Sequence, residues 1–70
     1  MLPLTFANVG EPMEIVKVGG SPEVRSHLAD LGFVVGGTVM VINTINGNVI
    51  VNVKETRVAI SSQMAQKIYV

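Results

Sequence analysis

Three side chains that could bind a metal ion lie close together in the sequence: Glu23, His27 and Asp30. Their spacing places them on one face if the segment is helical. A carboxylate–imidazole–carboxylate set can hold a divalent transition metal weakly. His27 is the only histidine and there is no cysteine, whereas dedicated transition-metal sites normally use several such ligands. The favoured interpretation is a solvated polar helix face, with a weak metal site as the alternative.

Catalytic and phosphate-binding patterns are missing from the sequence. There is no G-x-x-x-x-G-K-[ST] or G-x-G-x-x-G loop, so the glycines are expected to serve as turn residues. The serines have no nucleophile-elbow context, and one histidine without a carboxylate pair offers no acid–base system. We therefore predict a protein that is not an enzyme and needs no cofactor.

The charge pattern argues against a nucleic-acid partner, and the lack of a long apolar run argues against a membrane span. Five basic and five acidic residues give a formal net charge of zero, and the basic ones are spread along the chain. Phosphate-backbone binding needs concentrated Lys and Arg, and base stacking needs several aromatic side chains. The longest purely apolar run, Val39 to Ile42, is far too short to cross a bilayer. The start of the chain lacks the pattern of a signal peptide.

The possible metal ligands belong to a predicted helix with clear ends. Ser21 is a good N-cap, and Pro22 fits the first helical position. Gly32 is placed to end the helix in a left-handed conformation, which is expected to bring Phe33 into contact with Leu28. One apolar stripe is expected to pack on the rest of the protein: Val24, Leu28 and Leu31.

The remaining segments read as short strands. Asn46-Gly47 is a strong signal for a two-residue hairpin turn. Residues 1–12 form an irregular lead-in, in which Leu4, Phe6 and Val9 are expected to tuck against the core. Ser61 is expected to cap a single helical turn over 62–66. Five strands are predicted, over residues 13–18, 38–45, 48–53, 57–60 and 68–70.

A tight turn at Asn46-Gly47 pairs Ile45 with Asn48 and fixes the hairpin register. The core face is then expected to carry Met40 with Val53, Ile42 with Val51, and Thr44 with Val49. On the mixed opposite face, three side chains are expected to be partly exposed: Val41, Ile45 and Ile50. With Arg25 and His27 on the outer helix face, these are the candidate partner-binding residues. For Arg25 the alternative is a stem that covers apolar surface while its charge stays in water.

Closure of the strands removes exposed edges, which matters in a chain so rich in valine. We predict a mainly β fold: a small SH3-like, five-stranded, partly open barrel with one inserted α-helix and a short C-terminal helical turn. Residues 1–70 are expected to form a single domain.

The helix-to-strand segment resembles the ferrous iron transport protein A (FeoA) domain family. The resemblance rests on an R-x-x-L-x-x-L-G-[apolar]-x-x-G pattern from Arg25 to Gly36. It extends over most of the chain, with matching positions in the lead-in, the first strand and the closing stretch 58–70. One departure is Glu55, where the family commonly has a glycine.

The resemblance implies a cytoplasmic accessory protein of ferrous iron uptake. Its implied partner is a membrane ferrous iron permease with a cytosolic GTP-binding domain, whose assembly or activity it would modulate. The alternative is a metal-binding or metal-sensing module, because a similar barrel forms the C-terminal domain of metal-dependent repressors. Weak self-association is compatible with both functions.

Overall fold

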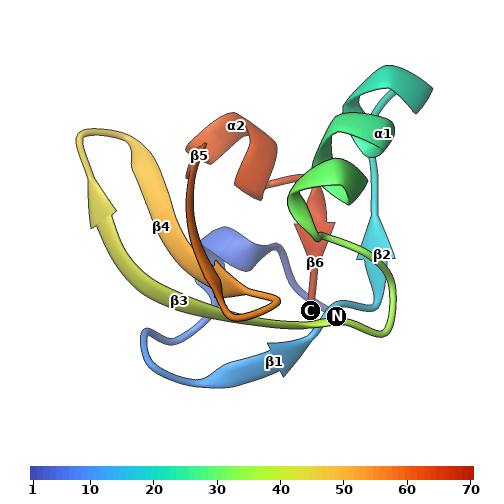
Figure 1. The fold of residues 1–70 in the computed structure, drawn as a ribbon. Helices are drawn as coiled ribbons and strands as arrows, with labels where there is room; N and C mark the ends of the chain where they lie inside the picture. The colour runs from blue at the N-terminus through green and yellow to red at the C-terminus, as the bar shows by residue number, and fades with distance from the viewer.

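A computed structural model describes all of residues 1–70. Its four-stranded sheet has the order β1-β3-β4-β5, and its two-stranded sheet pairs β2 with β6. The fold is mainly β and SH3-like, as predicted. In chain order (Figure 1), the elements are η1 (Leu4–Phe6), β1 (Pro12–Glu14), β2 (Lys17–Val18), α1 (Pro22–Leu31), β3 (Thr38–Ile45), β4 (Asn48–Val53), β5 (Thr56–Ser61), α2 (Ser62–Ala65) and β6 (Ile68–Tyr69). No helix is both long and apolar enough to cross a membrane.

The structure has six strands rather than the predicted five, because the first predicted strand is divided. Residues before the break pair with β3, and residues after it pair with β6. At the break, the Ile15 N–H donates to Gly37 O (2.8 Å) and the Val16 N–H donates to Tyr69 O (2.8 Å). Ile15 is completely buried, so it marks the corner where the chain passes from one sheet to the other.

Helix α1 begins and ends where the sequence predicted. The Ser21 Oγ accepts a hydrogen bond from the Val24 N–H at 3.3 Å. Gly32 has a left-handed φ of 108°, and the Phe33 N–H donates to Leu28 O at 2.9 Å. This is the Schellman ending. It brings Leu28 and Phe33 together, and both are buried.

The predicted register of the β3–β4 hairpin is correct near the turn and wrong beyond it. Ile45 pairs with Asn48, as predicted, but a register shift between Val41 and Asn43 places Val41 opposite Val51. A one-residue slip exchanges the two faces of a strand. Consequently the core of β3 consists of Val39 and Val41, whereas the predicted core residues Met40 and Ile42 are only partly buried. On β4 the predicted core residues are buried: Val49, Val51 and Val53.

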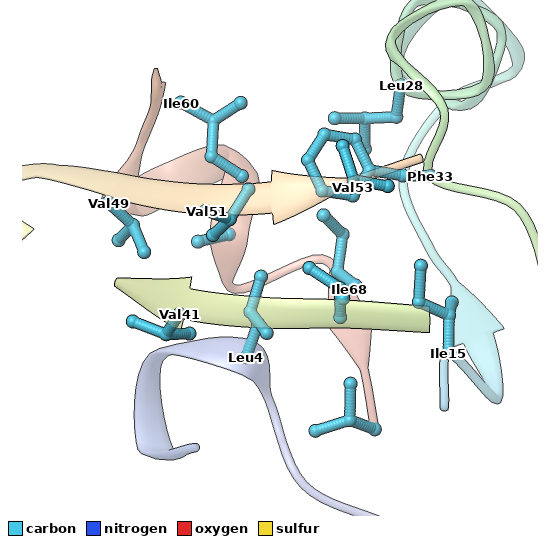
Figure 2. Packing of buried hydrophobic residues seen from close by; sticks show 13 residues of the cluster. Leu4, Ile15, Leu28, Phe33, Val41, Val49, Val51, Val53, Ile60 and Ile68 are labelled. Atoms are coloured by element: carbon cyan, nitrogen blue, oxygen red, sulfur yellow. The ribbon is translucent and has the colours of Figure 1, made fainter. Parts of the chain in front are cut away.

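The core lies between the sheets and is entirely apolar (Figure 2). Leu4 of η1 packs into it, but Phe6 and Val9, also expected there, remain 75% and 65% exposed. The buried cluster comprises Leu4, Ile15, Leu28, Phe33, Val39, Val41, Val49, Val51, Val53, Ile60, Ala65, Ile68 and Val70.

Candidate functional site

The polar face of α1 presents separate side chains rather than an assembled site. Glu23, His27 and Asp30 are all exposed. No three His, Cys, Asp or Glu side chains lie close enough together to hold a metal ion. Arg25 is also exposed. The helical spacing was therefore sufficient to align these residues on one element, but not to bring their ligand atoms together.

The outer face of the β3–β4 hairpin is partly as expected. Ile45 is 50% exposed and Ile50 is partly buried. The expectation that Val41 is partly exposed is wrong, because its side chain is only 4% exposed. The register shift turns Val41 inward, so it cannot contribute to a contact surface on the outer face.

An apolar groove of about 470 Å³ lies on the other side of this hairpin. Val41 and Val49 line it from β3 and β4, and Leu4, Phe6 and Val9 line it from the lead-in. Figure 2 shows Leu4 beside Val41 of β3, with Val49 on the neighbouring strand β4. The complete lining is Leu4, Thr5, Phe6, Ala7, Val9, Val41, Thr44, Val49, Ser62 and Gln66; we call these residues the groove.

The local geometry of η1 explains why one wall of the groove is exposed. The Ala7 N–H donates to Leu4 O at 3.0 Å, and such a tight turn places residues three apart on one side. Leu4 and Ala7 therefore face the core together, which leaves Phe6 on the outside. The Gly10 N–H then donates to Val41 O at 2.8 Å, and this bond holds the segment carrying Val9 against β3.

The opposite wall is held by α2 and the hairpin tip. Ser61 caps α2 through a hydrogen bond from the Met64 N–H to its Oγ (3.2 Å). The Ser62 N–H donates to Gly47 O at 3.0 Å, which joins the hairpin turn to the start of α2. Helix α2 also contacts η1, and the two lie close together in Figure 1. The groove is thus bounded by the lead-in, the β3–β4 hairpin and α2.

The chemistry of the groove is that of a neutral, apolar binding surface. None of its ten residues is ionisable, and six are hydrophobic. A charged group placed there would lose water without gaining an ionic partner. Hydroxyl and amide groups are available for orientation: Thr5, Thr44, Ser62 and Gln66. The groove is therefore suited to apolar side chains of a neutral segment.

Sequence reasoning missed this site because Phe6 and Val9 were assigned to the core edge. The lead-in has no periodicity from which burial can be derived. The usable signal was the three-residue spacing of Leu4 and Ala7 after Pro3, which on a 3₁₀ turn places Phe6 on the other side.

The comparisons with known proteins agree on one family. The FeoA domain matches residues 2–70. The Putative Fe(2+) transport protein A of Methanocaldococcus jannaschii is 34% identical over 70 residues, which are 100% of this chain and 85% of the relative. The crystal structure of an iron uptake regulatory protein (FeoA) superposes with a TM-score of 0.87 at 27% identity, covering 96% of this chain and 89% of the other.

A manganese-dependent transcriptional repressor has the same fold over part of its length. It superposes with a TM-score of 0.87 at 20% identity, covering 97% of this chain and 39% of the repressor. At this identity the likeness shows the fold alone. The family match extends over almost all of the sequence, from the lead-in to the last strand. The chain therefore belongs to the FeoA domain family.

Proposed function

We propose that this chain is a non-enzymatic, cytoplasmic accessory protein of ferrous iron uptake. It acts as a single domain that binds the cytosolic part of a GTP-binding membrane iron permease and modulates it. Family membership supports the role in Fe(2+) transport, because a relative that matches the whole chain is named for that process. The permease partner is the one implied by the family resemblance.

The observation that carries the proposal is the groove with its two exposed apolar side chains. Phe6 and Val9 expose 75% and 65% of their surfaces beside a groove of about 470 Å³ without ionisable residues. Exposed apolar side chains around a concave apolar surface are typical of protein-binding sites. The occupant is accordingly a neutral segment of the permease's cytosolic part that inserts apolar side chains.

NMR titration of the ¹⁵N-labelled protein with the permease's cytosolic domain tests this proposal. The amides of Phe6, Val9, Thr44 and Gln66 should shift together. Val9→Ala should weaken binding, whereas Val35→Ala should not. Val35 is a matched control because it is 66% exposed but does not line the groove. Absence of shifts, or shifts confined to the exposed face of α1, would contradict binding in the groove.

A metal-sensing module is the alternative function. The repressor-like fold is compatible with it, but the only donor set is the exposed row Glu23, His27 and Asp30, which do not form a cluster. Partner binding therefore has the stronger structural support.

A further inference from the structure

Strand β5 has one unpaired edge. It stands at the end of the four-stranded sheet and pairs only with β4. No backbone hydrogen bond joins Thr56–Ile60 to any element other than β4. The six pairs with β4 run without a register shift, and the strand contains no proline. It therefore has neither the bulge nor the proline that protects many edges, and Arg57 is its only charged residue.

The other edge of the sheet is protected. Strand β1 is only three residues long, and it includes Pro12 and Glu14. Short length, proline and charge are the features that discourage strand addition. The two edges thus differ in their ability to accept another strand, and β5 is the open one.

The turn geometry identifies the free backbone groups of β5. Lys54 and Glu55 form a two-residue turn with left-handed φ values of 49° and 62°, and Thr56 pairs with Val53. In such a hairpin the flanking pair is hydrogen-bonded and every second pair follows it. Thr56, Val58 and Ile60 therefore bond to β4. The N–H and C=O groups of Arg57 and Ala59 point away from the sheet.

We propose that β5 pairs antiparallel with β5 of a second copy of this chain, around a two-fold axis. A net charge of zero gives the copies no overall repulsion. Arg57 opposite Arg57 would place like charges together. Arg57 opposite Ala59 avoids this conflict and forms two narrow pairs, each exchanging two N–H···O bonds. The result is a sheet that is continuous through both copies.

The same register accounts for the partial burial of Val58. Its side chain is on the core side of β5, between the paired residues, but it is only partly buried. On the two-fold axis it lies opposite Val58 of the second copy, so dimerisation covers the remaining apolar surface. No groove residue belongs to β5, so the paired strands are not part of the groove. The inference is thus independent of the proposed function. A contact one strand wide gives a weak, concentration-dependent dimer.

Analytical ultracentrifugation of the full chain over a concentration series tests the register by charge. Ala59→Glu places a carboxylate opposite Arg57 twice, and should lower the dimer Kd roughly fivefold to tenfold. Ala59→Arg places like charges opposite each other and should raise it by a similar factor. Ala29→Glu and Ala29→Arg, on the exposed surface of α1, change the net charge equally and should not reproduce these opposite shifts.

Each contrary result overturns the proposal. A wild-type chain that stays monomeric at millimolar concentration excludes the dimer. Changes in the dimer Kd of the Ala59 variants that match those of the Ala29 controls exclude β5 as the interface. A higher Kd in both Ala59 variants indicates that Ala59 faces Ala59, which excludes the register proposed above.

Discussion

At the scale of single residues, His27 tests whether the polar face of α1 binds metal. Its side chain and those of Glu23 and Asp30 are exposed and do not form a three-ligand group. Anaerobic titration with Mn²⁺ should therefore give only weak paramagnetic broadening of α1 amides, and His27→Ala should leave it unchanged. Strong broadening at α1 that disappears in His27→Ala would instead establish the metal-binding alternative.

Glu55 is a strained residue whose replacement should stabilise the protein. It has a left-handed φ of 62° in the β4–β5 turn, and this conformation costs a non-glycine residue about 1–2 kcal/mol. Glu55→Gly should raise the free energy of unfolding by about 0.5–1 kcal/mol, since greater freedom of the unfolded chain offsets part of the relief. Urea denaturation measures the change.

The control for this strain is Glu14→Gly. Glu14 is exposed in β1, and its φ is not positive. Glycine there relieves nothing and weakens the strand, so the free energy of unfolding should fall. A loss of stability in both variants would show that the turn at Glu55 stores no relievable strain.

At the scale of elements, local signals predicted α1 much better than β3. Ser21 and Gly32 act on backbone groups within a few residues, so the helix ends could be read directly from the sequence. In β3, both alternating sets are apolar: Val39 with Val41, and Met40 with Ile42. Periodicity cannot choose between them, and the register shift that decides the matter depends on pairing with β4.

The register shift predicts a specific order of stability losses in β3. Val39 is completely buried, so Val39→Ala should lower the free energy of unfolding by about 2 kcal/mol through lost burial and a cavity. Met40 is only partly buried on the outer face, so Met40→Ala should cost less than about 1 kcal/mol. Denaturant melts compare the two variants. A larger loss of unfolding free energy in Met40→Ala than in Val39→Ala would instead support a hairpin without the register shift.

At the scale of the whole molecule, the two ends of the chain close the fold. Leu2 and Val70 exchange two backbone hydrogen bonds of 2.9 Å each, and the N- and C-termini lie side by side in Figure 1. The type of fold was predictable from strands, turns and the inserted helix. The groove was not, because its walls come from segments far apart in sequence that only the closed fold brings together.

The η1 turn separates the residues that stabilise the fold from those available for binding. Leu4 is 1% exposed in the core, so Leu4→Ala should lower the free energy of unfolding by about 2–5 kcal/mol. That is a large share of the roughly 4–10 kcal/mol expected for a domain of this size. Phe6, two residues later, is 75% exposed, so Phe6→Ala should change stability by less than about 0.5 kcal/mol.

Binding should respond in the opposite order. Phe6→Ala should weaken association with the permease's cytosolic domain although the protein remains as stable as the wild type, because an exposed aromatic side chain gains most when a partner covers it. Urea melts and NMR titrations of the same two variants measure both quantities. A large stability loss in Phe6→Ala would mean that Phe6 belongs to the core. Unchanged binding in a fully folded Phe6→Ala variant would remove the groove from the interface.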